Sequence, residues 1–284
     1  MKETPDEAAA REVRETFERL VGDTPRRNIH DLNRLEAHVK ERVYSLLVPD
    51  RIFEMLAIDR DTFANPRGER AVEVRAPEGA TFAVIEVRER PGDRDCVFFL
   101  EIEDTAFFKI DINFLIINDP RSPRFNTDVD TAGRRTKFAT VRRNIPEEIK
   151  AMEAGLAPGQ VRRGLRLFRR FAPLVLGFVE DMGQDTVIAE PLAYNNAIIF
   201  ESCGFNYIRG RRKMEEINAG FQPGGELYEK LDGSSPFRRP GMDKTVRGRA
   251  WAIHDGILGE PWRGIEMYRT KNPANVCTFP GWVY

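Results

Sequence analysis

Four short segments rich in Val, Ile and Phe follow one another in the first half of the chain, and they constrain the fold more than any other feature. The segments are 71–75, 81–88, 96–103 and 106–117. Residues of these types favour strands. The second and third segments are joined through the turn sequence Arg90-Pro91-Gly92-Asp93, and the third and fourth through Asp104-Thr105 alone. Links this short predict an antiparallel meander.

The last of these segments has two chemically different faces. Alternation along a strand puts Phe108, Ile110, Ile112, Phe114 and Ile116 on one face, and Lys109, Asp111 and Asn113 on the other. A row of polar groups on a central strand indicates the floor of a cleft, although a solvated face would give the same pattern. We predict that Asp111 lies nearest the reacting atoms, with Glu101 and Glu103 on the preceding strand as alternative carboxylates. If Lys109 or an arginine neutralises Asp111, its role is structural instead.

The remaining periodicities predict helices around this meander and one more buried strand. The expected helices are 6–22, 31–48 with Asp31 as a cap, 50–57, 146–154, 160–182 with Pro173 as a kink, 194–203 with Gly204 as its stop, 214–219 and 226–231. Thr186–Ala189 and 263–270 are expected strands, and 232–249 an irregular loop. The fold class predicted from this order is α+β, a mixed and mostly antiparallel central sheet flanked by helices.

Arginines gather where the 160–182 helix is expected to begin, directly after Pro158-Gly159. They are Arg162, Arg163, Arg166, Arg169 and Arg170, with Gly164 among them. A helix start presents unpaired N–H groups and the positive end of the helix dipole, which suits a phosphate. We expect a phosphate-bearing ligand near Arg162, Arg163 and Gly164; a solvated basic helix face is the alternative interpretation.

The segment 118–156 is long for an insertion within a compact domain, and prolines punctuate it. Insertions of this kind often cover binding sites, so we predict a lid over the acceptor side of the cleft. The segment that starts at Asp128 does not match a calcium-binding loop, because Ala132 and Ala139 occupy positions where such a loop needs oxygen ligands.

Composition limits the partners of the chain. Its 284 residues are 41% hydrophobic and 31% charged, with a formal net charge of −1, which argues against binding of bulk nucleic acid. Basic residues at 162–170 and 209–213 fit a small anionic ligand better. No apolar run is long enough to span a membrane, and no signal peptide is recognisable. Three cysteines and three scattered histidines give neither a disulfide framework nor a metal site, so we expect a cytoplasmic protein without metal.

The predicted order of elements over about residues 80–210 resembles that of the GNAT superfamily of acyl-CoA N-acyltransferases. This order is several strands, an anion-binding helix, a strand, and a helix that ends in Gly-Phe. That family carries Pro-x-x-(Arg/Gln)-x-x-Gly-x-(Gly/Ala) at its pyrophosphate site; the matching positions here are Pro158, Val161, Gly164 and Arg166. Its second landmark is an Asn-containing helix that reaches an aromatic residue and Gly-Phe; here these are Asn195, Asn196, Ala197, Phe200, Gly204 and Phe205.

The resemblance implies a domain order, a cosubstrate and a partner. It implies an N-terminal helical segment 1–68, a GNAT-like core 69–211 with the insertion 118–156, and a C-terminal extension 212–284. The cosubstrate would be acyl-CoA, either acetyl-CoA or a longer chain, without a metal; its partner would be a small-molecule amine acceptor. In that family the pantetheine arm lies where the fourth strand splays from the fifth. The cofactor-binding residues would be Gln160, Val161, Arg162, Arg163, Gly164, Asn195 and Asn196.

Within this scheme Asp111 would be the general base and Tyr194 the acid that protonates the leaving thiolate, unless Tyr194 is a buried packing residue. Val161, Arg166 and Phe200 depart from the family pattern; Phe200 replaces its catalytic tyrosine. These departures leave two alternatives open. One is an inactive, GNAT-like ligand-binding or regulatory protein, and the other is a transferase whose acyl or aminoacyl donor is linked to a carrier protein or tRNA. Neither the acceptor nor the oligomeric state follows from the sequence.

Overall fold

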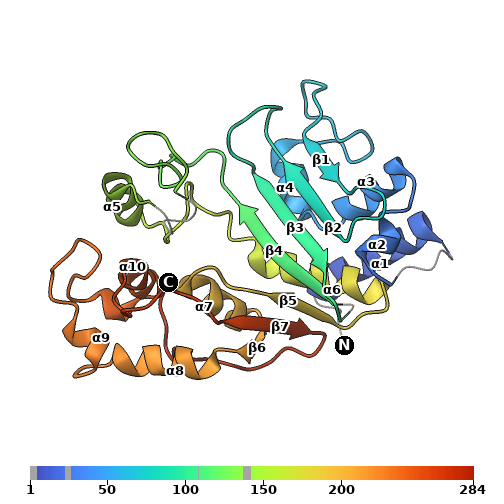
Figure 1. The fold of residues 1–284 in the computed structure, drawn as a ribbon. Coiled ribbons are helices and arrows are strands. Elements are labelled where there is room, and N and C mark those ends of the chain that lie inside the picture. The colour runs from blue at the N-terminus through green and yellow to red at the C-terminus, as the bar shows by residue number, and fades with distance from the viewer. Residues whose placement is uncertain (1–4, 23–26, 108, 137–141) are drawn as a thin grey trace. The chain divides into compact units, whose positions relative to one another are not determined.

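A computed structural model of the chain, which describes residues 5–22, 27–107, 109–136 and 142–284, has a mixed α+β fold (Figure 1). Its strands form one sheet in the order β1-β2-β3-β4-β5-β7-β6. These strands are β1 Val72–Arg75, β2 Phe82–Val87, β3 Phe98–Asp104, β4 Ile110–Ile117, β5 Thr186–Ala189, β6 Asn206–Arg209 and β7 Glu266–Thr270. The predicted fold class is confirmed: the sheet is open, mostly antiparallel and flanked by helices.

Ten α-helices and one short 3-10 helix occur in the described residues. They are α1 Pro5–Val21, α2 Ile29–Leu32, α3 Ala37–Ser45, α4 Asp50–Leu56, α5 Ile145–Glu153, α6 Phe168–Asp181, α7 Tyr194–Ser202, α8 Arg211–Gly220, α9 Glu226–Glu229, η1 Met242–Lys244 and α10 Val246–His254. The helix predicted over 31–48 is two helices, α2 and α3. Asp31 is not the cap; the Asn28 side chain accepts the N–H of Asp31 at 2.8 Å.

The chain divides into two compact units, each built from several stretches of sequence. The first unit contains residues 1–120, 164–189 and 268–272, and the second contains 121–163, 190–267 and 273–284. Strands β1 to β5 belong to the first unit and β6 to the second, while β7 contributes residues to both.

In the first unit, β1 to β4 form the predicted antiparallel meander, and β4 pairs in parallel with β5. Strand β4 begins at Ile110 rather than near residue 106. The N–H of Thr105 donates to the carbonyl of Lys109 at 2.7 Å, and the Thr105 hydroxyl accepts the N–H of Lys109 at 3.1 Å, which closes a turn there. Phe108, which we placed on the apolar face, lies outside the described residues.

A β-bulge at Asn113 breaks the predicted apolar face of β4. Glu101 lies opposite Phe114 and Ile102 lies opposite Ile112, so Asn113 is the extra residue between them. Beyond the bulge, Leu115 and Ile117 rather than Phe114 and Ile116 continue the face of Ile110 and Ile112. The alternation rule failed here because it assumes an uninterrupted period of two.

Helix α6 covers the sheet face that carries Phe98. The ring centroids of Phe171 and Phe98 are 6.1 Å apart. The ring centroid of Phe178 lies 5.4 Å from that of Phe17 in α1 and 6.0 Å from that of Tyr44 in α3. These aromatic side chains are almost fully buried, and each contributes on the order of 1.5–3 kcal/mol through loss of apolar surface. Pro173 lies in the second turn, and the helix runs through it unbroken.

The predicted start of this helix at residue 160 is wrong, because α6 begins at Phe168. Arg166 adopts a left-handed backbone with φ of 58°, and Gly164 forms a β-bridge with Asn118. Neither conformation is compatible with a right-handed helix. Of the five arginines, Arg169 and Arg170 therefore lie in the first turn, and the other three precede the helix.

In the second unit, α10 and β6 were not predicted. Helix α10 begins in the expected 232–249 loop, where the Thr245 hydroxyl caps it by accepting the N–H of Gly248 at 2.9 Å. Trp251 of this helix stacks on Phe237 with ring centroids 5.1 Å apart, and its indole N–H donates to the carbonyl of Leu156 at 2.9 Å. These contacts form the core that holds α5 and α10 together.

Candidate functional site

Strands β4 and β5 of the first unit run together only briefly and then part (Figure 1). Their parallel register covers Ile110–Ile112 opposite Val187–Ala189, after which β4 continues to Ile117. The bulge at Asn113 comes directly after the last pair, and bulges bend a strand and end its pairing. Among the described residues, Asn113–Ile117 therefore form no strand pair on the β5 side.

The start of α6 lies at the same end of β4. Asn118, the residue after β4, bridges to Gly164, and Gly164–Leu167 lead directly into the helix. In open α/β sheets, ligands bind outside the carboxyl ends of the strands, where a helix N-terminus favours anions. Leu167 at the N-cap has no side-chain oxygen to occupy the first N–H groups of α6.

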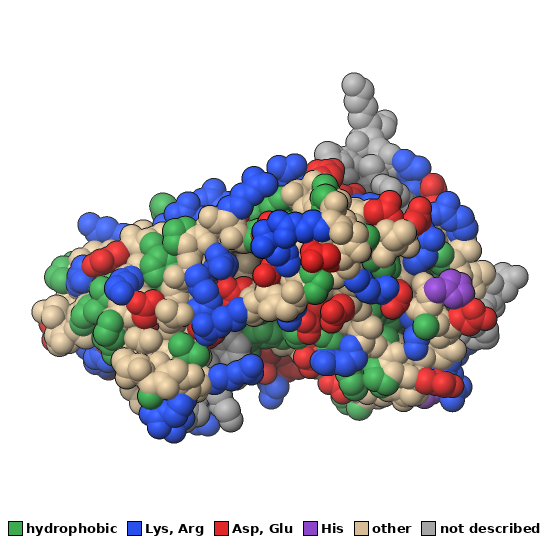
Figure 2. All heavy atoms as spheres, turned by 90° about the horizontal axis from the view of Figure 1, so that it is seen from above, with side chains coloured by type: hydrophobic (Ala, Val, Ile, Leu, Met, Phe, Trp, Pro, Cys, Tyr) green, Lys and Arg blue, Asp and Glu red, His purple; other side chains and the backbone are tan. Residues whose placement is uncertain are grey.

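The arginines at this helix start differ from the second basic cluster in the sequence. Arg166, Arg169 and Arg170 are exposed, and none of their side chains has a hydrogen bond or ion pair within the described part of the chain. The cluster around α8 is instead neutralised by glutamates at 2.6–2.9 Å, in the pairs Arg209–Glu266, Arg211–Glu215, Arg212–Glu216 and Lys213–Glu260. On the face of the molecule drawn in Figure 2, acidic and basic side chains are also mixed with one another.

Asp111 is brought together with both alternative carboxylates on the sheet face opposite α6. It lies directly across from Glu103, and the amide of Asn113 donates to Glu103 at 3.0 Å and to Glu101 at 3.5 Å. Lys109 donates to Asp185 at 2.6 Å. Three carboxylates on one face produce a negative potential that attracts a cationic amine.

Gln160, Val161, Arg162 and Arg163 belong to the second unit, where their polar groups bond mostly to the 118–156 insertion. The Gln160 side chain accepts the N–H of Ala157 at 2.7 Å, and the carbonyl of Val161 accepts the N–H of Phe125 at 2.8 Å. Arg162 donates to the carbonyl of Ser122 at 2.5 Å, and Arg163 to the carbonyl of Ala154 at 3.4 Å. Their cofactor-binding role stays a prediction.

Tyr194, Asn195 and Asn196 form the first turn of α7. Tyr194 is 1% exposed, and Arg249 donates to its hydroxyl at 3.5 Å. Burial raises the pKa of Tyr194 to about 12, although Arg249 opposes the shift. The Asn195 amide donates to Asn196 at 2.7 Å, but its own buried oxygen has no hydrogen-bond partner in the described residues. Such an oxygen calls for a donor from water or a ligand.

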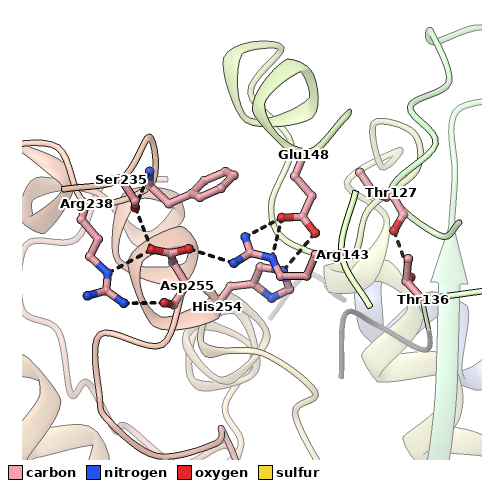
Figure 3. Close-up of polar contacts among 9 residues, drawn as sticks. Thr127, Thr136, Arg143, Glu148, Ser235, Arg238, His254 and Asp255 are labelled. Carbon is pink, nitrogen blue, oxygen red and sulfur yellow. Dashed lines mark hydrogen bonds and ion pairs between the residues drawn. The ribbon is translucent and has the colours of Figure 1, made fainter. Parts of the chain in front are cut away.

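A partly buried ionic network in the second unit was not predicted from the sequence (Figure 3). Arg143 donates to Glu148 at 2.5 Å and to Asp255 at 2.8 Å, and Asp255 also accepts from Ser235 at 2.7 Å and Arg238 at 2.9 Å. Burial alone would raise the pKa of Asp255, but these hydrogen bonds hold it below its ordinary value. Because the network joins α5 to the end of α10, it anchors the insertion that we expected to be a lid.

No group of three His, Cys, Asp or Glu side chains in the described residues could hold a metal ion. Within the same residues, no helix is both long and apolar enough to cross a membrane. No protein-family model, no curated protein and no solved structure matches the chain.

Proposed function

We propose that the protein is a GNAT-type N-acyltransferase that transfers an acyl group from acyl-CoA to an amine. The observation that carries the proposal is the parting of β4 and β5 at Asn113, beside the uncapped start of α6 with its three unpaired arginines. An extended ligand that ends in phosphates fits this arrangement. Its phosphates would meet Arg166, Arg169, Arg170 and the helix N–H groups, while its pantetheine arm would lie along the open side of β4.

The reaction requires an amine, a polarised thioester and a base. The amine nitrogen attacks the thioester carbon, the carbon–sulfur bond breaks, and the electron pair leaves with the CoA thiolate. Asp111 would accept the proton that the nitrogen loses, with Glu101 and Glu103 helping to attract the cationic amine beforehand. Backbone N–H groups on the open side of β4 would polarise the thioester carbonyl.

Other residues keep their assignments as predictions. The cofactor-binding role of Asn195, whose buried oxygen has no hydrogen-bond partner in the described residues, stays a prediction of the GNAT resemblance. The burial of Tyr194 and its hydrogen bond with Arg249 favour the packing role over the acid role, so the proposed reaction does not use the Tyr194 hydroxyl. A cytoplasmic location and the lack of nucleic-acid partners also stay predictions.

One observation favours a catalytically inactive relative as the second candidate. Phe200, at the position of the catalytic tyrosine in the GNAT pattern, stacks on Phe205 with ring centroids 5.0 Å apart and offers no hydroxyl. A protein of this kind would bind acyl-CoA without turning it over.

Calorimetric titration with acetyl-CoA tests the donor site. We expect binding, and we expect R169A/R170A to weaken it at least tenfold, because each charge-assisted bond to phosphate contributes on the order of 1.5–3 kcal/mol. The matched control is R211A/R212A, which removes two arginines that already have glutamate partners. Equal weakening by both variants would mean a diffuse charge effect, and no binding by the native protein would favour a carrier-linked donor.

Release of CoA thiol in the presence of a panel of primary amines tests the chemistry. With an accepted amine, we expect D111N to lower kcat on the order of a hundredfold or more while acetyl-CoA binding is kept, the usual scale for a general base. E103Q is the comparison, because it removes a neighbouring charge from the same face. Acetyl-CoA binding without turnover by any amine would support the inactive relative instead.

A further inference from the structure

Arg249 of α10 is a buried cation without a carboxylate partner. It is 2% exposed, and among the described residues no Asp or Glu forms an ion pair with it. Its Nε donates to the carbonyl of Asp243 at 2.6 Å, and its Nη1 donates to the Asn218 side chain at 2.8 Å and to the Tyr194 hydroxyl at 3.5 Å. All of these acceptors are neutral. The carboxylate of Asp243 does not pair with Arg249, and its buried Oδ1 has no hydrogen-bond partner in the described residues.

Two hydrogen-bond donors at this arginine have no acceptor. The Nη2 group of Arg249 makes no hydrogen bond with the described part of the chain, and neither does the O–H of Tyr194, whose oxygen is already an acceptor for Nη1. At neutral pH the phenol keeps its proton, because burial raises the pKa of Tyr194 to about 12. Asn218 and the carbonyl of Asp243 fix the guanidinium, so the pair is preorganised.

Neighbouring aromatic rings compensate only part of the charge. The guanidinium carbon of Arg249 lies 3.5 Å from the ring centroid of Phe279 and 5.1 Å from that of Phe221. Cation–π contacts are individually modest beside the desolvation of a full charge, and a buried cation is normally paired with an anion. A guanidinium and a phenol side by side match the two oxygens of a carboxylate.

We propose that the second unit binds a small carboxylate at Arg249 and Tyr194. One carboxylate oxygen would accept a hydrogen bond from Nη2 of Arg249, and the other would accept one from the Tyr194 O–H. The negative charge of the carboxylate would balance the positive charge of Arg249. A singly charged, planar group fits better than a phosphate dianion, whose second charge would be buried without a partner. The inference does not depend on acyl-CoA chemistry.

The C-terminal segment covers this position and would have to shift for the ligand to enter. Phe279 lies over the guanidinium, and the preceding Thr278 is held by Glu201, which accepts its N–H at 2.9 Å and its hydroxyl at 2.6 Å. F279A should therefore speed carboxylate binding and release without removing either donor.

Calorimetric melting in acetate or succinate at constant ionic strength, set with chloride, tests the proposal. The Tm of the native protein should rise with the logarithm of carboxylate concentration. R249M should show no rise, and Y194F should need roughly tenfold more carboxylate for the same rise, since it loses one charge-assisted hydrogen bond. R212M, which removes an exposed arginine on α8, should respond like the native protein.

Every alternative has its own outcome. In carboxylate-free buffer, R249M should have a lower Tm than the native protein, because the Asn218 side chain and the Asp243 carbonyl lose their donor. The readout is therefore the rise in Tm that carboxylate causes in each variant. A Tm response in R249M equal to that of the native protein would place the binding elsewhere. A response to inorganic phosphate but not to acetate or succinate, or no response at all, would also overturn it.

Discussion

At the scale of single residues, Glu148 shows how strongly neighbours control a buried carboxylate. It is 2% exposed, and burial by itself would raise its pKa, but hydrogen bonds from His254 and Arg143 and their charges hold that pKa below its ordinary value. A carboxylate with a lowered pKa stabilises the fold above its unfolded value of about 4.3. This stability is lost as the pH falls through the lower, folded value.

We therefore predict that E148Q lowers the free energy of unfolding at pH 7 by roughly 3 kcal/mol, because it leaves the partly buried guanidinium of Arg143 with one carboxylate fewer. Urea unfolding at pH 7 and at pH 3 measures this. The loss should shrink at pH 3, because Glu148 of the unfolded chain is protonated there and part of the linked stability is lost. E153Q, on the same helix but exposed, is the control and should change stability by less than about 0.5 kcal/mol. A loss independent of pH would contradict the assigned role of the charge.

At the scale of elements, the sequence predicted correctly those helices and strands whose hydrophobic periodicity is uninterrupted along the segment. Strand β5 matches its predicted bounds, and α5 and α7 lie within one residue of theirs, because turn residues and apolar spacing agree there. Patterns failed where one residue leaves its regular conformation, as at the Asn113 bulge and at Arg166. They also failed for α10, where Gly248 and the buried Arg249 obscure the amphipathic pattern.

The left-handed backbone of Arg166 gives a prediction about the loop before α6. A residue with a Cβ is strained in this conformation by about 1–2 kcal/mol, and glycine is not. R166G should therefore be more stable than R166A by up to about 1 kcal/mol after the extra backbone entropy of glycine is subtracted. Both variants lose the same charge, so their difference in urea unfolding isolates the backbone. If R166A equals or exceeds R166G, the loop does not hold this conformation in solution.

At the scale of the whole molecule, neither unit is a continuous piece of chain. The first unit needs α6 from residues 168–181, because Phe171 and Phe178 cover Phe98, Phe17 and Tyr44. We predict that a fragment 1–120 shows no cooperative thermal transition by circular dichroism, whereas a fragment 1–189, which restores α6 and β5, does. A cooperative melt of the shorter fragment would show that the meander is stable without its helix.

The ion pair of Arg143 with Asp255 could not be predicted from the sequence for the same reason: the second unit is discontinuous, and 112 positions separate the two residues.

The gap in sequence between β4 and β5 also sets an order of events during synthesis. Strand β4 is complete at Ile117, but its parallel partner begins only at Thr186, after the whole insertion and α6 have been made. At about 5–20 residues per second, the ribosome needs roughly 4 to 14 seconds to cover that distance. During this time the edge of β4 has no partner strand, and until α6 is made the apolar face of the meander is also uncovered. An unpaired strand edge invites pairing with other chains. The growing protein therefore passes through a stage in which a chaperone that binds exposed apolar strands would find a target that the finished fold hides.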